Sequence, residues 1–534
     1  MAASFLISDC LETIFSTLLV KNPINYTYCY ISTKDIYSCT LVSKHWCKIS
    51  TPYLYAYPFH YFAYSKSHWN YYYEENPSYY KLIRTLLSCI PKSEIEQILI
   101  SNSFNIQKLL PSYISATFNY IAFIHGIIFD KILLNINSEK VTDNQKIWLP
   151  PYIIINDFQF SEISIPIMKY FVEYLCKHCD NLTTLDFPFA ISNDDLSDNI
   201  INLLTFNYDN GINKLTNLKE LSCVYNEVFN EDINKDSGKL PKDIYLALSN
   251  NICNLNLLYN ESMGPPFANS LSKFISLQKN LQYIILSETK YSSIFCDYFA
   301  PYKYNVSFNS LSTQSKSLQV LDFRYFDFSG INEEALNSLF LLKNIKKLKL
   351  NNCKIYYNLN YWAKNLTKLE VLEFYDNDIS LNSAKFLTQL FQSSPNTLTK
   401  LILNYNKINA KHSSKLTQQI PLYLHSLIHL ELRIITIDQL INIFKSCIEL
   451  TYLNVALSGK KNFKDLGKFI PKSLQKIRFG NLLFKSNELK FFLEECVNND
   501  SKLKYIEIVN CAIKDKYFDV VKEFDVKLIK VSTS

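Results

Sequence analysis

Apolar and polar residues follow one recurring nine-position pattern along most of this chain. The segment Asn344–Ile355 reads NIKKLKLNNCKI, with apolar side chains at Ile345, Leu348 and Leu350. These three residues fall on one face of a short strand, because side chains alternate across a strand. The pattern therefore predicts a strand with one buried face, followed by a turn at Cys353.

The same pattern recurs in phase from residue 182 to residue 503. The mean spacing is about 29 residues, which leaves room for a helical return segment in each unit. One such unit cannot bury its apolar face alone, so neighbouring units must stack into a continuous core. The first apolar positions of the twelve frames are Leu182, Leu218, Ile252, Leu281, Leu318, Ile345, Leu369, Leu398, Leu427, Leu450, Leu474 and Leu503.

This pattern resembles the leucine-rich repeat, in which Asn or Cys at the ninth position hydrogen-bonds the backbone of the turn. The resemblance implies an α/β fold, a curved solenoid with a parallel sheet inside and helices outside. Besides the frame that ends at Cys353, the frames with Asn or Cys at this position are Leu218–Asn226, Ile252–Asn260, Leu369–Asn377, Leu398–Asn406 and Leu503–Cys511.

The N-terminal segment Phe5–Leu54 has the pattern of three short helices. Residues 11, 14, 15 and 18 are apolar at the spacing of one helical stripe. A second helix is predicted from the capping-box character of Ser32–Asp35. A third helix should follow Ser43 and end near Pro52, because proline disfavours helix at the residue before it.

These N-terminal residues resemble an F-box over about 50 residues. The matching stretches are Asp9-Cys10-Leu11-x-x-Ile14-Phe15, Leu41-Val42-Ser43-Lys44-x-Trp46 and Pro52-x-Leu54-Tyr55. The resemblance implies a substrate receptor that docks on a Skp-type adaptor and the cullin core of a ubiquitin ligase, with an unidentified protein as substrate. The adaptor-binding face that the resemblance assigns comprises Leu6, Leu11, Ile14, Phe15, Leu41, Val42 and Trp46.

Three regions are predicted along the chain: an F-box-like helical domain at 1–56, an aromatic-rich linker and helical segment at 57–160, and the repeat array at 161–534. Within the second region, helices are expected at Tyr79–Cys89 and Ser115–Leu134. Glu162–Cys179 should form the helix before the first repeat strand. A helix at Asp515–Phe524 and a strand at Val526–Val531 should close the array.

Composition and charge restrict the partners. With 48% hydrophobic and 19% charged residues, the chain can bury a large core. A net charge of +6 without a Lys/Arg-rich run argues against nucleic acid and anionic membrane as partners. The acidic N-terminal start does not match a signal peptide, no apolar run reaches ~18 residues, and the cysteines are scattered singly. We therefore expect a cytoplasmic or nuclear protein, monomeric outside its complex.

Motifs that carry catalysis are missing from the sequence. The eight glycines cannot form a phosphate-binding or nucleophile-elbow motif. His425-x-x-x-His429 has metal-ligand spacing, but Ser426 stands where a zincin needs Glu. Cys176-Lys177-His178-Cys179 looks like half of a zinc site without its second half, so we favour core packing for it. We expect no enzyme activity, no metal and no cofactor.

Outward-facing strand positions are the candidates for partner binding. The third and fifth residues of each frame face the concave side, and the seventh extends the same row. Tyrosine and arginine at these positions match the residues that dominate protein interfaces. These positions also hold Lys347, Lys349, Lys400, His429 and Lys476. The predicted substrate-binding residues are Tyr283, Asp322, Arg324, Glu373, Tyr375, Glu431, Arg433, Tyr452, Arg478 and Tyr505.

Two other function classes compete with the ligase interpretation. A repeat scaffold could bind a partner protein without entering a ligase, its helical N-terminus only capping the array. A small-GTPase activator would need an exposed arginine finger, for which Arg324, Arg433 and Arg478 are the candidates. We expect the second class least, because nothing else in the sequence supports it.

Overall fold

A computed structural model of the chain divides into two compact units. The N-terminal unit comprises residues 1–270 and 277–279, and the C-terminal unit comprises residues 271–276 and 280–534. The structure describes residues 7–18, 21–23, 29–31, 34–61, 77–101, 116–128, 157–179, 181–187, 217–224, 251–259, 265–288, 301–376, 379–405, 410–458, 463–480, 485–509 and 515–531.

Fourteen strands form one sheet whose strand order follows the chain. Within each unit the neighbouring strands pair in parallel, as in the Val371–Lys400 and Val371–Lys347 registers. This α/β architecture is consistent with a leucine-rich-repeat solenoid. The strands are β3 (Gly126–Ile128), β4 (Thr184–Phe187), β5 (Glu220–Val224), β6 (Asn254–Tyr259), β7 (Tyr283–Glu288), β8 (Val320–Arg324), β9 (Lys347–Asn351), β10 (Val371–Asp376), β11 (Lys400–Tyr405), β12 (His429–Thr436), β13 (Tyr452–Ser458), β14 (Lys476–Phe479), β15 (Tyr505–Val509) and β16 (Lys527–Val531).

Each of the twelve predicted frames contains one strand, which begins two residues after the first apolar position. In β9, for example, the strand begins at Lys347, two residues after Ile345. The side chains of Ile345, Leu348 and Leu350 are fully buried, as the pattern predicted. The twelve-frame repeat is therefore confirmed within the described residues.

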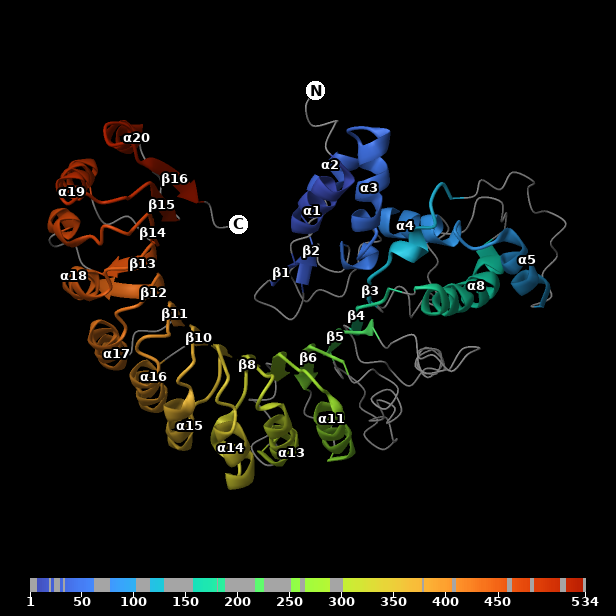
Figure 1. Ribbon diagram of the computed structural model, residues 1–534, viewed down its shortest axis with the longest axis horizontal. Coiled ribbons are helices and arrows are strands. Elements are labelled where there is room, and N and C mark those ends of the chain that lie inside the picture. Colours follow the sequence, from blue (N-terminus) through green and yellow to red (C-terminus); the bar gives the residue numbers. More distant parts are fainter. Residues whose placement is uncertain are drawn as a thin grey trace. The chain divides into compact units, whose positions relative to one another are not determined.

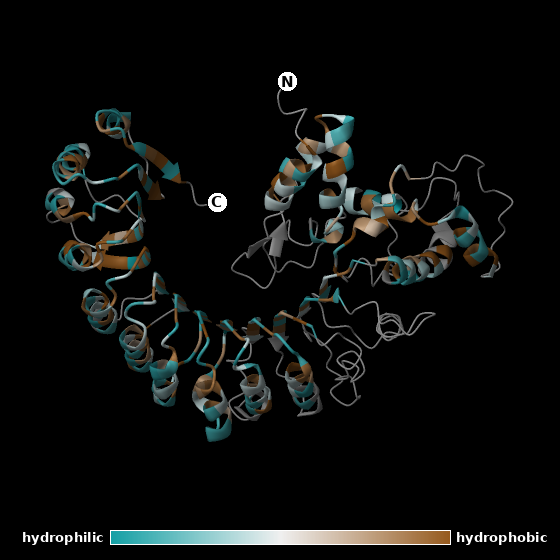
Figure 2. Cartoon of the chain, in the orientation of Figure 1, coloured by the Kyte–Doolittle hydropathy of each residue, from teal (hydrophilic) through white to brown (hydrophobic). Residues whose placement is uncertain are grey.

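Helices connect the strands of the C-terminal unit and lie on the outer side of its sheet (Figure 1). Each helix combines hydrophobic and hydrophilic residues, as expected when only one face is buried (Figure 2). Side-chain caps fix several helix starts: the Asn332 side chain accepts from the Ala335 N–H at 2.8 Å, and Thr436 and Gln439 form a capping box. The helices are α13 (Pro301–Leu311), α14 (Glu333–Phe340), α15 (Asn360–Asn365), α16 (Leu381–Ser393), α17 (Ala410–Tyr423), α18 (Ile437–Ser446), η9 (Phe463–Phe469), α19 (Ser486–Asn498) and α20 (Asp515–Lys522).

The N-terminal unit begins with α1 (Ser8–Leu18), α2 (Lys34–Thr40) and α3 (Lys44–Leu54), with β1 (Lys21–Pro23) paired antiparallel to β2 (Cys29–Ile31) between them. Helices occur where the sequence predicted them, while their assignment as an F-box stays a prediction. Helix α3 does not end near Pro52 as predicted but continues to Leu54. Pro52 lacks only its own N–H, and the Tyr55 N–H still bonds the Thr51 carbonyl at 3.1 Å.

The helix predicted at Ser115–Leu134 is wrong for its described part. The segment instead forms η4 (Tyr120–Phe123) and the sheet strand β3. Ile124-x-x-Ile127-x-Phe129 is one more copy of the apolar pattern, and Ile124 and Ile127 are fully buried. The tertiary demand for an additional edge strand therefore overrides the local helical signal.

The other predicted helices occur close to their expected ranges. The helix expected at Tyr79–Cys89 is α4 (Pro77–Leu87), and the one before the first repeat is α8 (Asp157–His178). The closing elements are α20 and β16. None of the described helices is long and apolar enough to cross a membrane. The N-terminal unit also holds η2 (Pro58–Tyr61) and α5 (Lys92–Ser101), while α11 (Pro265–Leu277) contributes residues to both units.

A short segment after α3 joins the helical region to the first strands of the N-terminal unit. The N–H groups of His125 and Gly126 both donate to the Ala56 carbonyl, at 2.7 and 3.0 Å. His60 Nε2 lies 3.1 Å from Asp186 Oδ2, and both side chains are buried. The helices are thus fixed to the sheet edge by packed contacts. The predicted domain boundaries at residues 56 and 160 stay predictions.

Candidate functional site

The helical N-terminus carries apolar residues of two kinds. Leu11 and Phe15 are fully buried and Trp46 is 9% exposed, and together they form the core of this region. The rings of Phe15 and Trp46 meet edge to face with their centroids 5.5 Å apart. Leu41 and Val42 are instead 70% and 53% exposed. The predicted adaptor-binding set therefore divides into residues that hold the helices together and residues available to a partner.

The turn between α2 and α3 presents the exposed pair. The N–H groups of Leu41 and Val42 donate to the Ser38 and Cys39 carbonyls, each at 3.2 Å, which closes α2. The Ser43 hydroxyl then accepts from the Trp46 N–H at 3.2 Å and begins α3. Because both backbones are fixed, the side chains at 41 and 42 are held outward. Ile14 on α1 is also exposed, at 39%, and Leu6 lies outside the described residues.

The strand registers of the C-terminal unit place the third, fifth and seventh frame positions in three rows across the sheet face opposite the helices. Lys347, Val371 and Lys400 pair across the third row, for example, and Lys349, Glu373 and Ile402 across the fifth. We call this surface the concave face, because the strands line the inner side of the arc in this unit (Figure 1). Side chains from up to ten strands therefore share one surface.

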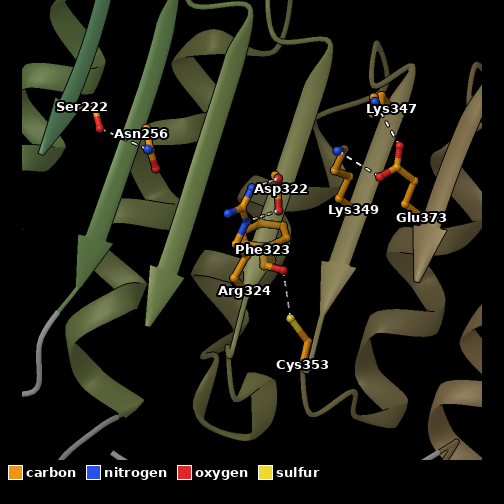
Figure 3. Close-up of polar contacts among 9 residues, drawn as sticks. All are labelled: Ser222, Asn256, Asp322, Phe323, Arg324, Lys347, Lys349, Cys353 and Glu373. Carbon is orange, nitrogen blue, oxygen red and sulfur yellow. Dashed lines mark hydrogen bonds and ion pairs between the residues drawn. The ribbon is translucent and has the colours of Figure 1, made fainter. Parts of the chain in front are cut away.

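On β8 the concave face carries a buried ion pair. Arg324 Nε donates to Asp322 Oδ1 at 3.0 Å and Nη2 donates to Oδ2 at 2.8 Å (Figure 3). Asp322 is 1% and Arg324 8% exposed. Burial lowers the pKa of Arg324, but the bidentate bond to Asp322 outweighs it, and the net direction is upward. Arg324 therefore keeps its charge, and little of either side chain is open to a partner.

One carboxylate forms ion pairs with two lysines of the neighbouring strand β9. Glu373 on β10 lies 3.1 Å from Lys347 Nζ and 2.9 Å from Lys349 Nζ (Figure 3). Burial raises the pKa of Glu373, but Lys349 and Lys347 together lower it below its usual value. Burial lowers the pKa of Lys347, and the nearby Lys349 adds to this, so the attraction of Glu373 is outweighed. Sharing one carboxylate between two cations explains why the two partners shift in the same direction.

A third cluster spans β12 to β14. His429 Nε2 lies 2.8 Å from Glu431 Oε1, and Asn454 Nδ2 donates to Glu431 Oε2 at 2.9 Å. Burial raises the pKa of Glu431, but these two hydrogen bonds and the charge of His429 bring it below its usual value. The ring of Tyr452 stacks on His429 with centroids 4.3 Å apart, and Lys476 Nζ lies 5.7 Å from the centre of the same ring. His429 and Lys476, the neighbours of Tyr452 in the third row, therefore both interact with its ring.

The ten predicted substrate-binding residues all lie on described strands, but they differ in access. Asp322, Arg324 and Glu373 are buried and paired within the face. Little of their surface is therefore open to a partner. Arg433 and Tyr505 are exposed. Those that are half-buried are Tyr283, Tyr375, Glu431, Tyr452 and Arg478.

Sequence reasoning missed the pairing pattern and one buried contact. The frame positions were known, but which lysine meets which carboxylate depends on the strand register and on side-chain burial. The His60–Asp186 contact joins residues 126 positions apart, and no sequence pattern marks it. Cys353 was expected to bond the turn backbone; its Sγ lies 3.6 Å from the Asn351 carbonyl before the turn, and it donates at 3.3 Å to the Phe323 carbonyl on the neighbouring strand β8 (Figure 3). Asn226, Asn260, Asn377, Asn406 and Cys511 lie outside the described residues.

In the part of the chain that the structure describes, no group of three His, Cys, Asp or Glu side chains could hold a metal ion. His429 faces Glu431, while His425 lies before the strand and is exposed. Cys179, from the half-site sequence, is 2% exposed and packs in the core. The chemistry that this geometry offers is surface recognition through paired charges, aromatic rings and an exposed apolar turn.

Comparison with known proteins gives little further information. No family model matches the sequence, and no curated protein matches it. A solved structure with some similarity is the leucine-rich repeat-containing protein LegL7 from Legionella pneumophila, at 15% sequence identity and a TM-score of 0.35. The alignment covers 64% of this chain and 98% of that chain.

Proposed function

We propose that this protein is a non-catalytic substrate receptor of a Skp–cullin–F-box ubiquitin ligase. The observation that carries the proposal is the exposed apolar pair Leu41–Val42, held outward on a turn between two packed helices. Large apolar side chains exposed together mark interaction surfaces. They also belong to the stretch whose sequence resembles an F-box.

The adaptor would cover this turn together with Ile14. Leu11, Phe15 and Trp46 would contribute indirectly, because they form the core that fixes the spacing of the helices presenting the contact residues. The segment from Ala56 to His60 ties these helices to β3 and β4, so the docking surface is not attached by a loose tether.

A protein substrate would bind the concave face of the C-terminal unit through its accessible aromatic and basic residues. Tyrosine and arginine contribute most of the energy in such interfaces. The ligase chemistry would belong to other subunits, and this chain would raise the effective concentration of substrate lysines near the conjugating enzyme. No cofactor is required for this role, and we place it in the cytoplasm or nucleus.

Co-purification with a Skp-type adaptor tests the proposal. We expect Leu41→Ala/Val42→Ala to abolish capture of the adaptor while the far-UV circular dichroism and urea midpoint stay unchanged, because neither side chain is buried. Leu422→Ala/Ile448→Ala, two apolar residues exposed on the repeat array, is the matched control and should retain the adaptor. Failure of the unmodified protein to bind the adaptor would rule out the ligase role.

That failure would favour the runner-up, a repeat scaffold that binds its partner outside any ligase. One observation supports this alternative: the F-box family usually has proline where this chain has Ile7, which is 66% exposed. Binding of a protein partner to the concave face without any adaptor binding would identify the scaffold.

A further inference from the structure

Among the described residues of the concave face, every acidic residue has a hydrogen-bond or ion-pair partner, whereas several basic residues form no ion pair. The three rows from β7 to β16 hold four carboxylates, and each one is bonded within the face. Asp322 binds Arg324, Glu373 binds two lysines, Glu431 binds His429 and Asn454, and Glu507 binds Lys476. The same rows hold eight Lys and Arg side chains, namely Arg324, Lys347, Lys349, Lys400, Arg433, Lys476, Arg478 and Lys527.

Half of these cations have no carboxylate partner among the described residues. They are Lys400 on β11, Arg433 on β12, Arg478 on β14 and Lys527 on β16, none of which forms an ion pair with a described carboxylate, although the charge of Lys400 helps to lower the pKa of Glu431. Arg478 hydrogen-bonds the Tyr452 hydroxyl, which orients it without neutralising it. The face therefore retains an excess of positive charge, concentrated between β11 and β14.

Arg433 occupies a special backbone position. The pairing of β12 with β13 shifts by one residue between Leu432 and Ile435, so Arg433 and Ile434 lie in a β-bulge or similar irregularity. Bulges often re-aim a side chain next to a binding site. Arg433 is exposed, and the seventh frame positions of β13 and β14 are the small residues Ala456 and Gly480. The seventh row therefore carries no large side chain on β13 or β14.

We propose that the concave face recognises an acidic, extended segment of the partner protein through Lys400, Arg433 and Arg478. We call these three residues the basic track. Lys400 and Arg478 are three strand spacings of about 4.8 Å apart across the sheet and two residues, or about 7 Å, apart along the strand, which gives a separation of about 16 Å. An extended segment of about five residues spans this distance, since each residue extends about 3.3 Å. Several carboxylates along the segment would then meet separate cations.

The arrangement disfavours other anionic ligands. A single phosphate group needs cations that converge on one point, whereas the basic track extends over four strands. Single-stranded nucleic acid needs open aromatic faces for base stacking. The Tyr452 ring between the basic residues already stacks on His429 and has Lys476 Nζ 5.7 Å from its centre, so it offers little open face to a base.

This inference names the substrate class for the concave face of the proposed function. The test measures fluorescence anisotropy of a fluorescein-labelled octa-glutamate peptide with the full-length protein. We expect binding that weakens steeply with salt, and an affinity about tenfold or more lower in K400Q/R433Q/R478Q. The matched control K343Q/K385Q/K415Q removes the same charge from exposed lysines on the helical side and should bind as the unmodified protein does.

Three results would overturn the proposal: no binding of octa-glutamate, equal losses in the two triple variants, or tighter binding of oligo-uridylate or of a neutral peptide with one phosphoserine. Adaptor capture is measured with the same proteins. Loss of peptide binding with intact adaptor capture contradicts only the acidic-segment inference. Peptide binding without adaptor capture contradicts only the ligase role.

Discussion

Asp322 and Arg324, both on strand β8, form an ion pair with two hydrogen bonds, whose donor–acceptor distances are 3.0 and 2.8 Å. The two residues are two positions apart, so they point to the same face of β8. Both are nearly inaccessible to solvent. The sequence predicted that Asp322 and Arg324 bind a substrate, but in the fold the two side chains are bonded to each other and buried in the concave face.

Removing one member of this pair should be costly. We expect Asp322→Asn to lower the free energy of unfolding by about 3–5 kcal/mol, because it leaves the Arg324 guanidinium buried without a counter-charge. Replacing both, as in D322L/R324M, should recover most of the loss, since no buried charge then remains. Urea denaturation of the two variants measures the difference. Equal stabilities of D322N and the unmodified protein would show that the pair is solvated.

The ion pairs of Glu373 with Lys347 and Lys349 predict that the free energy of unfolding depends on pH in the acidic range. Lys349 and Lys347 hold the pKa of Glu373 below its ordinary value of 4.5, so the carboxylate stabilises the fold at pH values above 4.5. That contribution is lost as the pH falls through the lowered folded-state pKa. We expect Glu373→Gln to be less stable than the unmodified protein at pH 7, and the gap to narrow as the pH falls below 4.5.

Urea titrations at a series of pH values measure this difference in unfolding free energy between E373Q and the unmodified protein. The exposed Glu449, which forms no ion pair among the described residues, provides the control E449Q. Its difference from the unmodified protein should stay small at every pH. A gap for E373Q that does not change with pH would mean that the two lysines do not stabilise the ionised form of Glu373.

The positions of the repeat strands could be predicted from the sequence, but the side-chain contacts between repeats could not. Period-two apolar patterning located all twelve predicted strands, because burial of one face dictates it. The strand β3 was missed because its three residues lie beside a turn, where the short apolar run also suits a helix. Access to Asp322 and Glu373 was not predictable, since it depends on neighbours from other repeats.

Trp46 should prove structural. It is 9% exposed and its ring packs against Phe15. We expect Trp46→Ala to destabilise the helical region by about 3–5 kcal/mol, with loss of adaptor capture as a consequence. Hydrogen exchange by mass spectrometry should show faster exchange in α1 and α3 and unchanged exchange in β9 to β12. Loss of adaptor capture with native protection of α1 would instead place Trp46 in the interface.

Cysteine reactivity separates the buried from the exposed thiols. Burial raises the pKa of Cys447 to about 12, and it also raises the pKa of Cys353, so neither forms thiolate near neutral pH. Cys10 is exposed. We expect iodoacetamide at pH 8 to modify Cys10 in the native protein, and Cys353 and Cys447 only in urea, as measured by peptide mass spectrometry. Rapid native labelling of Cys353 would mean that the turn opens.

Gly126 tests how the helical region is fixed to the sheet. A Cβ at this position would lie 2.4 Å from Tyr57 Cδ1 and 3.1 Å from His60 Cε1. We expect Gly126→Ala to displace these rings and to cost about 1–3 kcal/mol of unfolding free energy. The control Gly480→Ala meets only Ala456, at 3.1 Å from its Cβ, and should cost less than about 1 kcal/mol. If the two variants were equally stable in urea, Tyr57 and His60 would not pack on β3.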